Sequence, residues 1–279
     1  MRKYYDLHVH TKYSTLDGEK SDANSITELS RRAVGLGLSG VAFSDHFDVE
    51  DILNGKYPLD CDAIRDECIT AKNTVGKDFD VIHSVEIGTQ RYFQEFCAEN
   101  IAKYRYDMVL SSVHVLKKGD EFVSISRTNY SEMSEHESRQ MFDTYMQDVL
   151  YTAKNCDFDV LTHLTYPLRY FKRHGILHIA DIKSDMDIYD EVFRTIIQRG
   201  IAPEINTSGI RQGHGGTFPD MLLAKRYMEL GGELFTVGSD SHYPEHLGSD
   251  IKDVTDMLYG IGARYTVFFK ERKPVFVKL

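Results

Sequence analysis

Short apolar segments alternate with longer amphipathic ones along the chain, and this alternation constrains the fold more than any other feature. The apolar segments are rich in β-branched and aromatic residues, which predicts strands at Tyr4–Val9, Gly40–Phe43, Phe79–Val85, Asp107–Val113, Phe158–Thr162, Ala202–Ile205, Leu234–Val237 and, as an optional last strand, Tyr265–Phe269. Helical spacing of apolar residues predicts helices at Asn24–Gly37, Cys61–Val75, Glu137–Asn155, Asp185–Gly200, Pro219–Gly231 and Ile251–Gly260. Such alternation is typical of a parallel sheet covered by helices.

The number of strand–helix units favours a closed barrel over an open sheet. Seven or eight units in 279 residues suit a (β/α) barrel. An open doubly wound sheet commonly has a glycine-rich phosphate loop after its first strand, and neither G-x-G-x-x-G nor G-x-x-x-x-G-K-[ST] follows a predicted strand here. No linker rich in Pro, Gly or Ser divides the chain, so we expect residues 1–279 to form a single domain.

Charge and composition restrict the class of partner. Lys and Arg number 33 against 43 Asp and Glu, a formal charge of −10, which disfavours binding to nucleic acid or to an anionic membrane. No apolar run approaches the ~20 residues of a membrane span, and the opening MRKYYDLHVH does not resemble a signal peptide. The cysteines fit no metal or redox motif, so we expect reduced thiols in a cytoplasmic protein; they are Cys61, Cys68, Cys97 and Cys156.

Histidines and carboxylates gather where the predicted strands end. In a parallel barrel the carboxyl ends of all strands share one rim, so these distant residues should meet there: His8, His10, His46, Glu86, His114, His163, Asp240 and His242, with Asp17 in the first loop. His8 and His10 lie at i and i+2 of a strand, so both can face the barrel mouth. Nitrogen and oxygen ligands without thiolate suit Zn, Mn or Fe, and nine candidates are too many for one ion. The sequence therefore predicts two or three divalent ions. The other histidines, among them His83, are expected to be packed or solvent-facing.

Several of these segments together resemble a known family. DLHVHT, the SDH that ends at His46, the single Glu86, the SSVH that ends at His114, THL around His163 and the GSDSH that ends at His242 are similar to motifs of the polymerase and histidinol phosphatase (PHP) superfamily. SSVH followed by a long insertion, and NTSG at 206–209, point to its phosphatase branch. The resemblance extends from residue 1 to about 250 and implies a distorted, TIM-like (β/α)7 barrel.

The resemblance also implies a role for each candidate ligand. By this comparison His8, His10, Glu86 and Asp240 hold a first metal. Glu86 bridges to a second metal that His114 and His163 complete, and the third ligand set is Asp17, His46 and His242. Asp17 could equally be a turn residue before Gly18, and Asp22 or Glu19 could replace it.

The activity that the resemblance implies is hydrolysis of a small phosphomonoester, namely L-histidinol phosphate to L-histidinol and phosphate. A hydroxide shared by two ions would attack phosphorus in line. For the arginine that binds phosphate we favour Arg211, then Arg169. Asp45 is a candidate acid/base or a residue that orients His46. The segments 48–57 and 206–219 are candidate walls for a cationic leaving group.

Three alternatives remain open from the sequence. The same site could act on nucleotides or nucleic-acid ends, although the acidic balance argues against long polyanions. The second alternative is a non-catalytic metal-binding domain. Such a domain should have lost several ligands, whereas the full set of candidate ligands is present in this sequence. An amidohydrolase-like deacylase also opens with His-x-His, but no lysine lies in 107–115 where that class commonly carries one.

Overall fold

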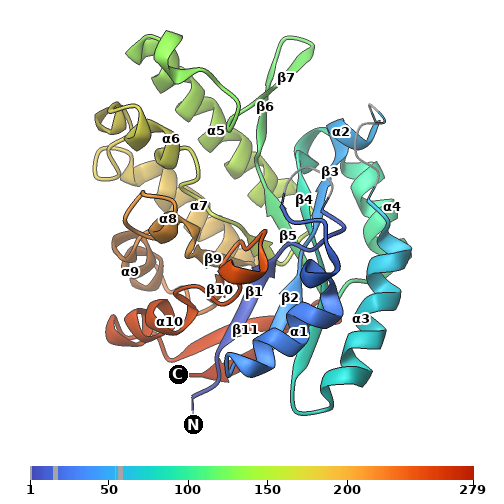
Figure 1. Cartoon of the computed structure of the whole chain (residues 1–279). Coiled ribbons are helices and arrows are strands. Elements are labelled where there is room, and N and C mark those ends of the chain that lie inside the picture. Colours follow the sequence, from blue (N-terminus) through green and yellow to red (C-terminus); the bar gives the residue numbers. More distant parts are fainter. Residues whose placement is uncertain (1, 15–17, 54, 56–58) are drawn as a thin grey trace.

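The computed structural model describes residues 2–14, 18–53, 55 and 59–279 as a barrel of parallel strands wrapped by helices (Figure 1). Within these residues the main sheet follows the order β1-β2-β4-β5-β8-β9-β10. Its strands are β1 (Tyr5–Val9), β2 (Gly40–Phe43), β4 (Asp80–Gly88), β5 (Met108–Ser112), β8 (Val160–Leu161), β9 (Ala202–Asn206) and β10 (Thr236–Gly238). The expected distorted (β/α)7 barrel is confirmed.

The barrel closes between its first and last strands at the carboxyl end. Val9 forms a parallel bridge to Ser241. The His10 amide donates to the Ser241 carbonyl at 2.8 Å, and the Asp240 amide donates to the His8 carbonyl at the same distance. The closure therefore brings His8 and His10 beside Asp240, at least 230 residues away in sequence.

An additional short strand, β3 (His46–Asp48), pairs with the second half of β4. β4 runs three residues further than predicted, so its first half pairs with β2 and its second half with β3. In this register His46 lies opposite Glu86. The sequence prediction missed β3 because it has only three residues and follows β2 almost directly.

The helices cover the outside of the barrel (Figure 1). They are α1 (Ile26–Gly35), α2 (Val49–Leu53), α3 (Cys61–Val75), α4 (Gln94–Tyr104), α5 (Glu135–Asn155), α6 (Leu168–Arg173), α7 (Met186–Arg199), α8 (Ser208–Arg211), α9 (Met221–Glu229) and α10 (Ile251–Gly260). Side-chain caps fix several starts; Ser134 and Glu137 form a reciprocal capping box at α5. The six predicted helices are all present, whereas α4 was missed because it buries only Cys97 and Ile101 and so has a weak apolar face.

Two antiparallel hairpins flank the barrel. β11 (Tyr265–Lys270) and β12 (Lys273–Lys278) pair with each other, so the optional last strand is not a barrel strand. The Phe268 ring stacks on Tyr5 at 4.9 Å and closes the amino end of the barrel. β6 (Val115–Lys118) and β7 (Glu121–Ser124) form the second hairpin directly after His114, and it projects beyond the barrel mouth (Figure 1).

The cysteines are buried and carry free thiols, as expected. Across the described part of the chain, none of the helices combines the length and the apolar character that crossing a membrane would require.

Candidate metal centre and active site

Glu86 lies at the centre of the histidine cluster, with its Oε2 atom 2.9 Å from Nδ1 of His46 and both oxygens near further imidazoles. Its Oε2 atom is 3.4 Å from Nε2 of His8 and 3.6 Å from Nε2 of His10. Its Oε1 atom is 3.1 Å from Nε2 of His163 and 3.4 Å from Nε2 of His114. Because β4 is central in the sheet, one carboxylate reaches ligands from strands on both of its sides. The arrangement suits a carboxylate that bridges two ions.

Asp240 joins the first of these sets. Its Oδ1 atom is 3.4 Å from Nε2 of His10 and 4.0 Å from Nε2 of His8. It follows β10 with a φ of 53°, in the left-handed region, so the chain turns directly after the strand. This turn, rather than strand alternation, places Asp240 and His242 at the mouth.

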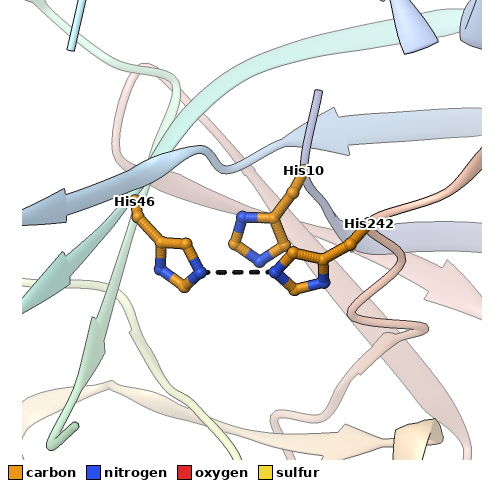
Figure 2. A group of neighbouring side chains, drawn as sticks. All are labelled: His10, His46 and His242. Carbon is orange, nitrogen blue, oxygen red and sulfur yellow. Dashed lines mark hydrogen bonds between the residues drawn. The ribbon is translucent and has the colours of Figure 1, made fainter. Parts of the chain in front are cut away.

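His46 and His242 approach each other on the open side of the first set (Figure 2). Their Nε2 atoms are 3.3 Å apart, and the His10 ring stacks on both, with centroids at 4.2 Å from His46 and 4.0 Å from His242. These three residues have ligand atoms close enough to hold one ion. Asp17, the other residue predicted for this set, lies outside the described residues.

The mutual approach of imidazole nitrogens tests whether a metal fits. Nε2 of His8 is 3.1 Å from Nε2 of His10, and Nε2 of His114 is 3.5 Å from Nε2 of His163. At such distances the two nitrogens cannot both carry a proton, and lone pairs facing each other repel. A divalent cation between them satisfies both, and nitrogen with carboxylate oxygen is a donor set for Zn, Mn or Fe. The residues therefore fit a metal.

Charges within the cluster favour ionised carboxylates. Burial alone would raise the pKa of Glu86, but His8, His114 and His46 hold it well below its ordinary value. Burial and the neighbouring imidazoles of His242 and His46 lower the pKa of His10. The cluster thus offers anionic oxygen and at least one neutral imidazole, which are the forms that bind metal.

Two carboxylates that the sequence prediction missed orient these histidines. Glu204 on β9 accepts a hydrogen bond from Nδ1 of His8 at 2.7 Å and from the His163 amide at 2.9 Å. Asp48 on β3 lies 3.2 Å from Nδ1 of His114. Each leaves the Nε2 atom of its histidine directed at the cluster. The sequence offered a signal for Asp48, which lies two residues after His46 and so on the same strand face. It offered none for Glu204, which is an isolated acid in an apolar strand.

Asp45 is turned toward the first loop. Its carboxylate accepts hydrogen bonds from the Thr11 amide at 2.6 Å and the Thr11 hydroxyl at 2.8 Å. Burial outweighs these bonds and raises its pKa to about 6. These contacts hold the backbone that directly follows His10. The two roles predicted for Asp45, acid/base catalysis and orientation of His46, stay predictions.

The two candidate arginines differ in what they contact. Arg211 donates to the carbonyls of Ser239 at 2.5 Å and Asp240 at 2.6 Å, so it fixes the backbone after β10. Arg169 donates to the Ser208 hydroxyl at 3.2 Å, and its Nε has no hydrogen-bond partner in the described part of the chain. Both arginines line the smaller of the two cavities described next, and which of them binds phosphate stays a prediction.

The histidine and carboxylate cluster opens into two adjoining cavities. One, of about 400 Å³, is lined by cluster residues together with Arg169 and Arg211. The other, of about 810 Å³, lies between α2 and the β6–β7 hairpin. The predicted walls contribute to both: Asp48 and residues of α2 line the larger cavity, and Arg211 and Gln212 line the smaller one.

Comparisons with known proteins agree with this fold. The family model described as the PHP domain matches residues 6–208. The probable histidinol-phosphatase of Clostridium acetobutylicum is 28% identical over 271 residues, covering 96% of this chain and 97% of that protein. That of Thermotoga maritima is 26% identical over 274 residues, covering 98% and 99%. The crystal structure of histidinol phosphate phosphatase from Lactococcus lactis, complexed with Zn, L-histidinol and phosphate, aligns with a TM-score of 0.79 at 20% identity, covering 98% and 99%.

Proposed function

The chain belongs to the PHP domain family, and from that premise we propose that it is a histidinol-phosphatase, hydrolysing L-histidinol phosphate to L-histidinol and phosphate. Relatives described as probable histidinol-phosphatases or histidinol-phosphatase match 86–98% of the chain, at 25–28% identity. The observation that carries the proposal is Glu86, whose two oxygens face two imidazole sets beside a cavity that contains arginines.

Two or three divalent ions would bind at the cluster. His8, His10, Glu86 and Asp240 would hold the first, Glu86, His114 and His163 the second, and His46 and His242, with Asp17, the third. Zn, Mn and Fe all suit these donors, and the Lactococcus structure contains Zn. When bound, the ions supply an activated water and positive charge that offsets the charge of the phosphoryl group.

The protein's own residues position the substrate around that centre. Arg169 binds the phosphoryl oxygens through its guanidinium, which lines the smaller cavity. The guanidinium stays in place because it lies over the Tyr166 ring, 4.9 Å from the centroid, and over Phe218 at 5.0 Å. Arg211 holds the backbone of Asp240 in the position that brings its carboxylate to the cluster. Glu204 and Asp48 orient the imidazoles of His8 and His114.

We place the enzyme in histidine biosynthesis and in the cytoplasm, as one domain of residues 1–279. Buried free thiols and a substrate made inside the cell support this location. The alternative of a phosphoesterase for nucleotides or nucleic-acid ends finds less support, since a formal charge of −10 repels long polyanions.

A turnover panel tests the proposal. The metal-loaded chain is assayed for phosphate release from L-histidinol phosphate and nucleoside monophosphates, and for cleavage of single-stranded DNA. We expect L-histidinol phosphate to have the highest kcat/KM, and chelation or His114→Ala to abolish its hydrolysis. His178→Ala, which alters an exposed histidine that contacts Glu135, is the matched control. A preference for DNA or nucleotides, or activity that survives chelation, would overturn the assignment.

A further inference from the structure

The two cavities at the histidine cluster meet at a common boundary but differ in the charged side chains that line them. Both are lined by His46, His114, Ser126 and Tyr166. Beyond this boundary the smaller cavity is lined by both candidate arginines and by the proposed metal ligands Glu86 and Asp240. The larger cavity, which we call the acidic cavity, is lined by Asp48, Glu50, Asp51, Asp120 and Glu121, with Arg127 as the one lysine or arginine among its described lining residues. With metal bound at Glu86 and Asp240, as the proposed function requires, a ligand that spans the boundary would meet positive charge at one end and negative charge at the other.

Glu50 distinguishes the acidic cavity from an ordinary solvated acidic surface. The residue is only 6% exposed, and its Oε2 atom has no hydrogen-bond partner within the described ranges. A buried carboxylate oxygen without a donor is costly, so a donor from a ligand would be favourable. Burial and the nearby charge of Asp48 raise the pKa of Glu50 to about 7, which a bound cation would reverse.

The walls of the acidic cavity suit an organic cation rather than a bare ion. Phe93 and Phe122 line it, with ring centroids 5.7 Å apart, and Leu53 adds apolar surface. Aromatic faces attract ammonium and imidazolium groups. Its volume of about 810 Å³ is within the range of small-molecule sites. Asp48 contacts His114, whereas Asp120 and Glu121 lie on the hairpin and face the cavity from the opposite side to α2.

We propose that the acidic cavity binds the cationic leaving group of the substrate, with Glu50 as its buried anchor and the β6–β7 hairpin as its outer wall. This rests on the proposed function, in which the leaving group is an amino alcohol that carries an ammonium and an imidazole. The phosphate occupies the smaller cavity, and the bond to be cleaved lies at the boundary near His46 and His114. Selectivity for cationic phosphate esters then resides in α2 and the hairpin, apart from the residues that bind metal and phosphate.

The test compares esters that differ in one positive charge. kcat/KM is measured for O-phosphoethanolamine and ethyl phosphate, and for L-histidinol phosphate, with the metal-loaded full chain. The variants are Glu50→Gln and the double variant Asp120→Asn/Glu121→Gln, which alters only the hairpin. Glu99→Gln removes the same charge from an exposed position on α4 that lines neither cavity. Calorimetric binding of L-histidinol provides a readout that does not require turnover.

We expect the wild-type chain to prefer O-phosphoethanolamine to ethyl phosphate by about tenfold or more, and Glu50→Gln to lower that preference at least fivefold. The hairpin variant should lower it by a smaller factor, because its carboxylates are more exposed, and both variants should bind L-histidinol more weakly than Glu99→Gln does. Equal preference in all variants, no preference in the wild type, or unchanged binding of L-histidinol would overturn the inference. Hydrolysis of O-phosphoethanolamine without that of L-histidinol phosphate would refute the proposed substrate but still measure the acidic cavity.

Discussion

Glu204 on β9 accepts a hydrogen bond from Nδ1 of His8 on β1, at 2.7 Å, across the interior of the barrel. Both side chains are buried, at 0% and 1% exposure. Burial opposes protonation of His8, but the carboxylates of Glu204 and Glu86 outweigh it and raise the pKa of His8 well above its ordinary value. With Nδ1 committed to Glu204, Nε2 is the atom that His8 presents to a metal. The same carboxylate accepts from the His163 amide, so it positions one histidine of each set.

Glu204→Gln should therefore weaken metal binding. The amide offers one acceptor where the carboxylate offers two, so either His8 or the His163 amide faces an N–H group instead of an oxygen. We expect metal affinity to fall about 10–100-fold. Metal content after dialysis against a competing chelator measures this directly. Glu229→Gln, on the exposed end of α9, is the control. Equal metal affinity in the wild type and Glu204→Gln would refute the positioning role.

Gly88→Ala should disturb the second imidazole set through Asp48. A Cβ at residue 88 would lie 1.8 Å from Oδ1 of Asp48, the atom that contacts Nδ1 of His114. Asp48 would have to move, leaving His114 without its orienting partner. We expect a loss of activity of about 10–100-fold, accompanied by weaker metal retention.

Gly35→Ala provides the matched control for Gly88→Ala. It lies at the end of α1 with nothing within 4 Å of the added methyl group, and should stabilise the fold by about 0.5–1 kcal/mol. Thermal melts and phosphate release of both variants give the comparison. Normal activity in Gly88→Ala would show that Asp48 does not need its present position.

Most of the barrel could be predicted from sequence because buried parallel strands are continuously apolar. Gly40–Phe43 was predicted with its observed bounds, as were Cys61–Val75 and Ile251–Gly260. The errors occurred where local pattern carries little information. β3 has three residues, too few for a periodic pattern to be detected. Tyr265–Lys270 has the composition of a strand, but only tertiary packing determines that it pairs with β12 and not with the barrel.

The candidate site was predictable to the extent that its residues end strands. His8, Glu86 and Asp240 meet as that logic requires. The hydrogen-bond partner of the imidazole nitrogen that faces away from the cluster depends on the register between strands, which composition does not reveal. Glu204, the partner of Nδ1 of His8, was missed for this reason. The hydrogen bonds from Arg211 to the backbone of residues 239 and 240 could not be predicted either, because they depend on the turn after β10.

Substitution should separate the roles of the two arginines. Arg169→Ala removes a phosphate ligand, and we expect kcat/KM to fall about 10²–10³-fold with the metal content per chain retained. Arg211→Ala removes two donors from the backbone at Ser239 and Asp240, so it should release metal as well as activity. Parallel measurement of metal per chain and of phosphate inhibition distinguishes them. Metal loss in Arg169→Ala but not in Arg211→Ala would reverse the assignment.

His83 makes stability depend on pH at a position remote from the cluster. It lies on β4 at 6% exposure, with its ring 4.6 Å from the Tyr106 ring. Burial lowers its pKa to about 4, while the unfolded chain binds a proton near the ordinary value of 6.5. The folded state therefore favours the neutral form of His83. This contribution to the free energy of unfolding is complete above pH 6.5 and is lost as the pH falls toward 4.

His83→Phe retains a ring against Tyr106 but cannot titrate. Between pH 7.5 and 4.5 we expect the wild type to lose about 2 to 3 kcal/mol more unfolding free energy than His83→Phe. Urea unfolding at each pH, in the presence of a chelator so that metal loss does not contribute, measures the difference, with the exposed His178→Phe as control. Parallel pH curves for the wild type and His83→Phe would show that this histidine is not the group responsible.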